Sequence, residues 1–484
     1  MDIKKEAVRG TRWSALSMVV GLFLRMGAFA VLARVLDPAV FGVMSMLMVV
    51  VSIIKIFADM GMSGAFIHYQ EVTHEELSTF FWVNIISGFV LWIISFAISP
   101  LVALYYHMES LRFYLPLLGV SFILYAPGIE YRVLLQKELR MKPISLIEIA
   151  TESVTYAMII VLALRGFGIF SLIAGELFRA FFLSLLLFLY GKREWMPSFI
   201  FFLPSMGKFF RFGAYQMGER TIRLVNQNLD YLIIGRYLGA TPLGYYSLAY
   251  NIMLRPMQRV NPVITRVAFP ALSKFQDDDA TIKRYFLKMI NLISFYSFPL
   301  YACLIAVAHP LVLTLYGPGW EPTARVLVPL SMLGMLYAIG NPMGSLLLAK
   351  GRADIGFWLN LVQIFLLAMA LRLGVLWGIE GVAWTLFFLT LFIFVPIGFW
   401  VRKKVVGMGV FEYIKQTLSP LTFSVISCLI TWGVGKFLFF SSHPLTLIVL
   451  LVVFLISYFV QVFSLERERF MGYVKLFLAF RETF

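Results

Sequence analysis

Arginine supplies most of the polar chemistry between residues 218 and 266, in a stretch that is otherwise largely apolar. At 100° per residue the polar side chains form one stripe on each of two successive helices, namely Arg220, Arg223, Gln227 and Asp230, then Arg255, Arg259 and Arg266. A charge at mid-bilayer costs roughly 2.5–3.5 kcal/mol, so these stripes are expected to face a water-filled cavity or a binding site. Arginine suits anionic oxygens because its planar fork donates paired hydrogen bonds and keeps its proton. The alternative is that these helices lie at the interface, with the arginines reaching the headgroups.

The composition places these arginines in a membrane protein. Of the 484 residues, 60% are hydrophobic and 14% are charged, whereas soluble proteins carry about 25% charged residues. The formal net charge is +15, which in a soluble protein would suggest a nucleic-acid partner. Cys303 and Cys428 lie in apolar runs without metal-ligand spacing, so we expect neither a metal site nor a disulfide framework.

Apolar runs long enough to cross a ~30 Å hydrocarbon core recur along the whole chain. We therefore predict an all-α integral membrane protein without a soluble domain. About fourteen transmembrane helices are expected, at roughly 13–36, 41–67, 80–104, 113–135, 144–165, 168–190, 212–238, 244–272, 285–308, 324–349, 354–374, 379–401, 413–436 and 444–464.

The lysines and arginines of the connections predict the orientation. With the N-terminus inside, 26 of the 41 basic residues fall in inner connections and 7 in outer ones. Basic residues stay on the cytoplasmic side, so we expect both termini in the cytoplasm of a multi-pass inner-membrane protein. This asymmetry accounts for most of the positive charge without nucleic acid.

An internal repeat divides the chain. Gly42 matches Gly244 at an offset of 202, and Lys137 matches Lys350 at an offset of 213. Six predicted helices separate the copies, so both copies have the same orientation. Two parallel six-helix bundles with a substrate site at their interface form a transporter architecture. We expect bundles at 1–200 and 201–402, followed at 403–484 by two further helices and a cytoplasmic amphipathic tail.

Several motifs then occur in an order that resembles a known family. They are the runs 33–42, 57–65, 78–84, 134–139, 211–213, 228–236, 243–250 and 269–273. Through them the chain resembles the Wzx-like polysaccharide exporters of the multidrug/oligosaccharidyl-lipid/polysaccharide flippase superfamily, in the branch of colanic-acid and teichuronic-acid exporters. The resemblance extends to about residue 402, and it implies a fold like that of MATE transporters and lipid II flippases. Lys55 and Met141 depart from the pattern, which has an apolar residue and a phenylalanine there.

The resemblance implies a function as well. The substrate would carry an undecaprenyl tail, a pyrophosphate and an oligosaccharide repeat unit, and would cross the cytoplasmic membrane for exopolysaccharide or O-antigen-type synthesis. Polysaccharide polymerase, glycosyltransferases and membrane lipids are the candidate partners. Guanidinium groups bind phosphate oxygens in pairs, so we predict as headgroup ligands Arg25, Arg220, Arg223, Arg255 and Arg259.

Further charged residues within the predicted spans are candidates for the cavity or for coupling to Na⁺ or H⁺. They are Lys55, Asp59, Glu148, Glu152, Arg179, Asp230 and Arg266. Lys55 and Asp59 are four residues apart and can pair on one helix, in a structural role or in the transport cycle. Arg179 can pair in the same way with Glu176, three residues before it, and there we favour a structural role.

Glu148 and Glu152 share one face of the fifth predicted helix and have no evident basic partner in the sequence. A carboxylate within a span is costly without a function or a partner. Either residue could therefore carry a proton or Na⁺, or it could cap a lysine of an inner loop.

Two other functions fit a membrane protein of this size. A cation-coupled exporter of small drug-like molecules would be expected to have a net acidic cavity, whereas the candidates within the membrane are eight basic residues against six acidic ones. The basic residues are Arg25, Lys55, Arg179, Arg220, Arg223, Arg255, Arg259 and Arg266, and the acidic ones are Asp59, Glu148, Glu152, Glu176, Glu219 and Asp230. A glycan polymerase or ligase would be expected to have a large reactive outer loop, whereas the longest outer connection, near 309–323, is short and nearly uncharged. Neither an enzyme, an ATPase nor a resident cofactor is expected.

Overall fold

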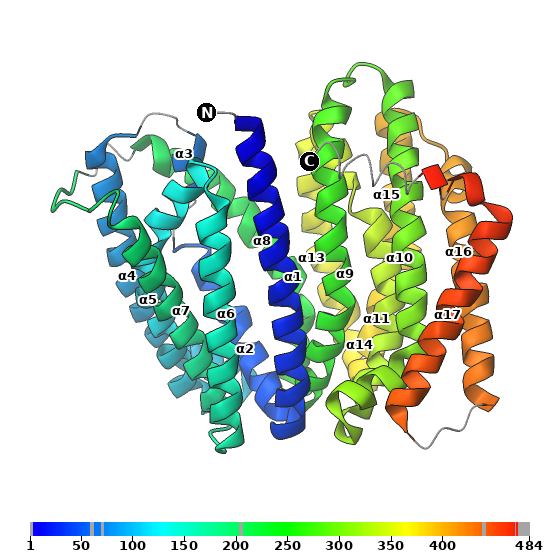
Figure 1. Cartoon of the computed structure of the whole chain (residues 1–484), viewed down its shortest axis with the longest axis horizontal. Helices are drawn as coiled ribbons and strands as arrows, with labels where there is room; N and C mark the ends of the chain where they lie inside the picture. The colour runs from blue at the N-terminus through cyan, green and yellow to red at the C-terminus, as the bar shows by residue number, and fades with distance from the viewer. Residues whose placement is uncertain are drawn as a thin grey trace. The chain divides into compact units, whose positions relative to one another are not determined.

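The computed structural model describes residues 3–58, 62–68, 72–202, 207–437, 442–469 and 471–472, and these residues form α-helices and no strand (Figure 1). They belong to two compact units, Met1–Gly244 and Tyr245–Phe484, which we call the N-terminal and C-terminal units. The division at 1–200, 201–402 and 403–484 stays a prediction.

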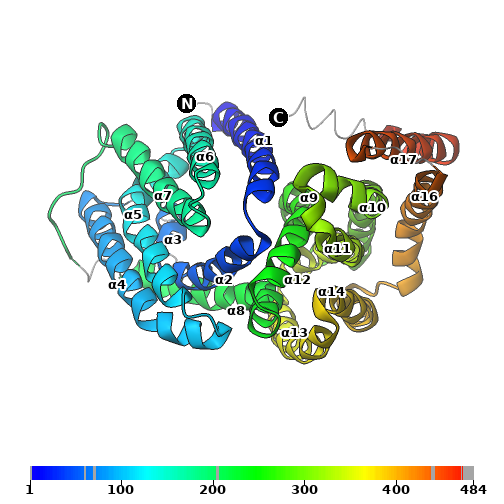
Figure 2. The same cartoon turned by 90° about the horizontal axis from the view of Figure 1, so that it is seen from below.

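The N-terminal unit contains eight helices and the start of a ninth. They are α1 (Ile3–Val35), α2 (Pro38–Lys55), α3 (Met62–His68), α4 (His74–Tyr106), α5 (Leu111–Lys137), α6 (Met141–Leu164), α7 (Ile169–Gly191), α8 (Gly207–Tyr237) and α9 (Ala240–Ser273). Helix α5 packs between α4 and α7. Helix α1 lies along α6, as both views show (Figures 1 and 2).

The C-terminal unit holds the rest of α9 and the remaining helices. They are α10 (Asp279–Tyr316), η2 (Pro318–Trp320), α11 (Glu321–Gly340), α12 (Met343–Ala349), α13 (Ala353–Gly374), η3 (Val375–Trp377), α14 (Gly378–Leu389), the π-helical turn η4 (Thr390–Phe394), α15 (Val395–Val406), α16 (Val410–Phe437) and α17 (His443–Leu465). The last two pack on α10, where Phe423, Phe454 and Tyr458 form a core with Phe295. The terminal helix pair is therefore part of the core of this unit.

Eleven segments of the described chain are long and apolar enough to cross a membrane. One of them, Asp354–Val406, contains both α13 and the consecutive helical elements α14, η4 and α15. Helices α8 and α9 have 31 and 34 residues but are not counted among the eleven, because many of their side chains lie outside the described part of the chain. The membrane-protein prediction is confirmed, whereas the count of fourteen stays a prediction.

The predicted continuous helix at 41–67 is wrong. Helix α2 ends at Lys55, and the separate helix α3 begins at Met62. The amides of Ile56, Phe57 and Ala58 each donate to a carbonyl three residues earlier instead of four. This tightening of the last turn is typical of a helix end.

Gly42 and Gly244, which match each other in the internal repeat at an offset of 202, lie in one reciprocal contact within the N-terminal unit. A Cβ atom on Gly42 would overlap the carbonyl oxygen of Ala240, and one on Gly244 would overlap the carbonyl oxygen of Pro38. Ala240 is itself 202 residues after Pro38. A reciprocal contact of this kind is what a local two-fold relation between the copies produces.

Replacing Gly42 by alanine is expected to destabilise the protein by about 1–3 kcal/mol, because the new methyl group must push two helix starts apart. Gly27→Ala is the matched control, since a Cβ atom at Gly27 would meet nothing within 4 Å. Thermal unfolding of the purified proteins, followed by tryptophan fluorescence, measures the difference. Equal midpoints for the two variants would contradict the contact.

Candidate functional site

Glu152 on α6 joins three helices of the N-terminal unit. Its Oε1 accepts a hydrogen bond from Arg25 Nη2 on α1 at 3.3 Å and another from Arg179 Nη2 on α7 at 3.4 Å. Arg25 also donates from Nε to the hydroxyl of Tyr156 at 3.0 Å. Helix α1 comes this close because it has Gly21 here, where a Cβ atom would overlap Glu152 Oε2.

A second carboxylate on α6 continues this charged cluster. Arg132 Nη2 on α5 donates to Glu148 Oε1 at 2.5 Å, and the hydroxyl of Ser17 on α1 donates to Glu148 Oε2 at 3.1 Å. Glu148 and Glu152 are four residues apart and therefore lie on one face of α6. The expectation that they lack basic partners is wrong, because their partners come from other helices.

The cluster extends to α2. Lys55 Nζ lies 4.1 Å from the centre of the Tyr125 ring on α5, and Glu176 on α7 interacts electrostatically with both Lys55 and Tyr125. Arg179 Nη1 lies 4.0 Å from Glu176 Oε2, which confirms the pair expected from their spacing. Asp59 lies outside the described residues, so its pairing with Lys55 stays a prediction.

We call this set the N-terminal charged cluster, defined as Arg25, Lys55, Arg132, Glu148, Glu152, Glu176 and Arg179. It holds four cations and three carboxylates, all in segments apolar enough to cross a membrane. About a third of the Arg25 and Arg179 side chains is exposed, compared with 17% of Glu152. Part of each arginine is therefore uncovered by protein, and each is held in place by a carboxylate.

The sequence-predicted ligands of α8 and α9 are only partly described. Arg223 on α8 is exposed, Asp230 is buried, and Arg255 on α9 is half-buried. Asp230 Oδ1 accepts from the amide of Tyr231 at 2.9 Å. The side chains of three predicted residues lie outside the described part, namely Arg220, Arg259 and Arg266. Of the predicted headgroup ligands, Arg25 has defined hydrogen-bond partners, and Arg179, which was predicted as a cavity or coupling residue, binds the same carboxylate.

Sequence reasoning placed Arg132 in an inner connection and missed its role in the cluster. It lies on α5, more than one turn before the helix ends at Lys137. A signal was present, because the predicted apolar span at 113–135 includes this arginine. Tyr125 and Tyr156 carry no such signal, since tyrosine is common in membrane spans.

Another arginine fastens the end of α7 to the connection between α5 and α6. Arg140 Nη1 donates to Glu194 Oε2 at 2.5 Å and to Glu138 Oε2 at 3.2 Å, and Nη2 donates to the Tyr190 hydroxyl at 2.8 Å. The carboxylate of Glu194 raises the pKa of the Arg140 guanidinium above its usual value. Arg140 is thus a fixed structural charge.

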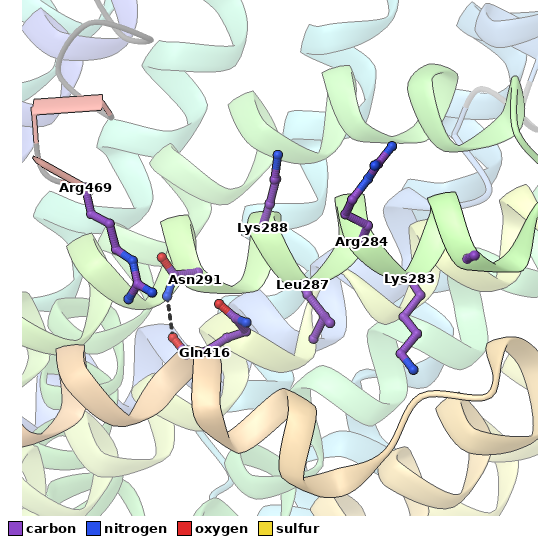
Figure 3. A pocket seen from close by; sticks show the side chains of 8 residues that line it. Lys283, Arg284, Leu287, Lys288, Asn291, Gln416 and Arg469 are labelled. Atoms are coloured by element: carbon purple, nitrogen blue, oxygen red, sulfur yellow. Dashed lines mark hydrogen bonds between the residues drawn. The ribbon is translucent and has the colours of Figure 1, made fainter.

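A basic hollow of about 520 Å³ lies in the C-terminal unit, beside α10. Figure 3 shows Lys283, Arg284 and Lys288 on α10, with Arg469 at the other end and Asn291 donating to the backbone carbonyl of Gln416. Lys283 pairs with Glu412 at 2.6 Å, and Arg469 pairs with Glu466 at 3.1 Å. The hollow is open at the ends of its helices, where salt screens charges. The N-terminal charged cluster is therefore the stronger candidate for an anion.

The known proteins that this chain resembles decide its family. A family model described as "Polysaccharide biosynthesis protein" matches residues 31–325. The chain belongs to this family. The match includes the whole N-terminal charged cluster except Arg25, and it ends before Gln416, the residue of α16 that lines the basic hollow.

Curated relatives agree over most of the chain. The teichuronic acid biosynthesis protein TuaB of Bacillus subtilis is 30% identical and covers 90% of both chains. The lipopolysaccharide biosynthesis protein WzxC of Escherichia coli is 32% identical over 90% of this chain and 89% of its own. The succinoglycan biosynthesis transport protein ExoT of Rhizobium meliloti is 25% identical over 78% and 77%. The resemblance inferred from the motifs is confirmed, and so is the class, a membrane transporter in polysaccharide biosynthesis.

Solved structures confirm the fold. The lipid II flippase MurJ, in an inward closed conformation, has a TM-score of 0.73 at 15% identity and covers 96% of this chain and 100% of its own. An inward-facing multidrug transporter of the MATE family has a TM-score of 0.57 at 13% identity, with 87% and 98% covered. The chain therefore has the predicted fold of flippases and MATE transporters.

Proposed function

We propose that this protein is a flippase, which moves an oligosaccharide linked to a lipid pyrophosphate from the cytoplasmic to the outer leaflet of the inner membrane. The observation that carries the proposal is the N-terminal charged cluster, in which cations outnumber carboxylates inside a membrane-spanning unit. Membership of a polysaccharide biosynthesis family, with relatives named for teichuronic acid, lipopolysaccharide and succinoglycan biosynthesis, supports it.

The chemistry of the cluster fits a pyrophosphate. Arg25 and Arg179 converge on one acceptor, Glu152 Oε1, so their donors are spaced for a single anionic group. Phosphate oxygens could take the place of that carboxylate, because guanidinium forks bind both anions in the same geometry. The polyprenyl tail would stay in the bilayer while the headgroup crosses beside these arginines. Glu152 would hold the donors in place when no substrate is bound.

Orientation and partners complete the proposal. Both termini would lie in the cytoplasm, as the distribution of basic residues predicts. Glycosyltransferases would deliver the lipid-linked unit on that side, and a polymerase would use it on the outer side. The cationic residues predicted on α8 and α9, Arg220, Arg223, Arg255 and Arg259, would contribute further headgroup contacts.

The test is transport by the full-length protein in liposomes. With a fluorescent lipid-pyrophosphate oligosaccharide and a membrane-impermeant quencher, we expect protein-dependent loss of protection from the quencher. Liposomes without protein provide the baseline. Protein-dependent export of a fluorescent drug-like cation, with no movement of the oligosaccharide lipid, would instead establish the multidrug exporter and overturn the proposal.

A further inference from the structure

A carboxyl group outside the charged cluster is completely buried in the N-terminal unit. Glu130 on α5 has an exposure of 0%, and Asn84 on α4, which faces it, has an exposure of 1%. Asn84 Nδ2 donates to Glu130 Oε1. Isolated charges are rarely buried in this way, because an unpaired carboxylate loses its solvation.

The two remaining oxygen atoms of this pair have no hydrogen-bond partner. They are Glu130 Oε2 and Asn84 Oδ1, both inaccessible to solvent. Buried polar atoms are nearly always hydrogen-bonded, so two orphans on one interacting pair require an explanation. Both atoms are acceptors when Glu130 is ionised. One added proton on Oε2 makes that oxygen a donor, and the acid and the amide can then form two parallel hydrogen bonds.

Among the side chains that the structure describes, the charges of neighbouring helices do not neutralise Glu130. On α5, Tyr125 and Arg132 are rotated roughly 140° or more from Glu130, toward the N-terminal charged cluster. That cluster also takes up the charges of α2, α6 and α7, namely Lys55, Glu148, Glu152, Glu176 and Arg179. His68 of α3 has a side chain outside the described part. The titratable groups along the described part of the α4–α5 seam include Tyr131, Glu76, Lys137 and, at the start of α4, His74.

The seam between α4 and α5 differs at its two ends. Toward the C-terminal end of α4, a Cβ atom on Gly88 would lie 2.9 Å from the carbonyl oxygen of Phe122, so the two backbones are in close contact. Toward the N-terminal end of α4 the seam carries Glu76 and Lys137, which interact electrostatically. Lys137 is seven residues from Glu130, a rise of ~10 Å along α5. Two charged side chains, Glu76 and Lys137, therefore lie along the seam toward the end predicted to be cytoplasmic, whereas the buried polar groups toward the other end include the hydroxyls of Ser87, Ser95 and Ser121.

We propose that Glu130 and Asn84 form a proton-binding site in the N-terminal unit, and that this proton is exchanged during transport. In the loaded state Glu130 is a neutral acid paired with Asn84. On unloading, the Oε2–H bond breaks, its electron pair stays on the carboxylate, and the proton passes to water at the Glu76–Lys137 end of the seam. Two acceptors then face each other, so the seam must loosen to admit water. The exchange during transport rests on the proposed function, whereas the binding of the proton does not.

Glu130→Gln tests the loaded state without removing the pair, because a glutamine amide can donate to Asn84 Oδ1 and accept from Asn84 Nδ2. The measurement is infrared spectroscopy of the full-length protein in lipid nanodiscs, in H₂O and D₂O. We expect one protonated-carboxyl carbonyl band to be lost in Glu130→Gln and kept in Glu109→Gln, since the Glu109 side chain is 79% exposed. An unchanged band in Glu130→Gln would overturn the proton site.

The exchange of the proton during transport is tested with Glu130→Gln and Glu109→Gln, whose transport rates are measured in liposomes with an imposed pH gradient. We expect the gradient to change the rate of oligosaccharide-lipid movement in wild type and in Glu109→Gln, and to have no effect in Glu130→Gln. The same gradient response in all three proteins would overturn the exchange during transport. No movement in the wild type would refute the proposed function, while the infrared result would still decide the proton site.

Discussion

Replacing Arg25 and Arg179 together by alanine is expected to lower the rate of oligosaccharide-lipid transport by about a hundredfold. Each arginine supplies one charge-assisted donor to the same position, now occupied by Glu152 Oε1. A hydrogen bond to a charged group contributes about 1.5–3 kcal/mol, and each 1.4 kcal/mol corresponds to about a factor of ten. Two such bonds to a crossing pyrophosphate therefore account for a factor on the order of a hundred.

Two controls separate a lost ligand from a lost fold. Arg112→Ala with Arg325→Ala removes two exposed arginines, each in one ion pair with its side chain 63% exposed, and should leave the rate unchanged. Lysine at positions 25 and 179 keeps both charges but not the forks, so an intermediate rate is expected. If the double alanine variant elutes and unfolds like the wild type and also transports at its rate, these arginines are not headgroup ligands.

The sequence predicted interactions that are local on one helix and missed those between helices. Glu176 and Arg179 were paired correctly, because residues three apart are neighbours on any helix. The partners of Glu152 are 127 and 27 positions away, on α1 and α7. Spacing alone does not determine which helices meet. The two carboxylates of α6 therefore looked free when they were already paired.

The sequence likewise did not predict which residues near the end of a span are buried. Arg402 directly follows the predicted span at 379–401 and so was expected in an inner connection, yet it lies on α15 with an exposure of 6%. Its guanidinium is 4.5 Å from the centre of the Tyr413 ring on α16, a cation–π contact that pairwise spacing does not predict. Glu130 and Asn84 were visible in the sequence as polar residues, because each interrupts a predicted apolar span. Their pairing, however, depends on how α4 and α5 pack.

Replacing Glu152 by glutamine is expected to tighten binding of a pyrophosphate headgroup and to slow its transport. The carboxylate competes with phosphate for Arg25 and Arg179, and it repels an anion placed beside it. Glutamine keeps the shape and one acceptor oxygen but removes the negative charge. The neutral side chain should hold the arginines less firmly. Part of the binding free energy of the pyrophosphate is now used to displace Glu152 from the arginines, and in the variant this part would increase the affinity. Release of the headgroup into the outer leaflet would then become slower, since no carboxylate remains to replace the phosphate as the hydrogen-bond acceptor of the two arginines.

The expected result is a fall in the dissociation constant for inorganic pyrophosphate of about tenfold, equivalent to 1.4 kcal/mol, measured by calorimetry on the purified protein. The single-turnover transport rate should fall by a similar factor. Glu152→Asp keeps the charge and should change affinity less, while Glu109→Gln, at an exposed ion pair, should match the wild type. Weaker pyrophosphate binding in Glu152→Gln would mean that the carboxylate builds the anion site rather than competing for it. Glu152 would then be needed to position Arg25 and Arg179 for the anion, and competition between the carboxylate and the phosphate would be ruled out.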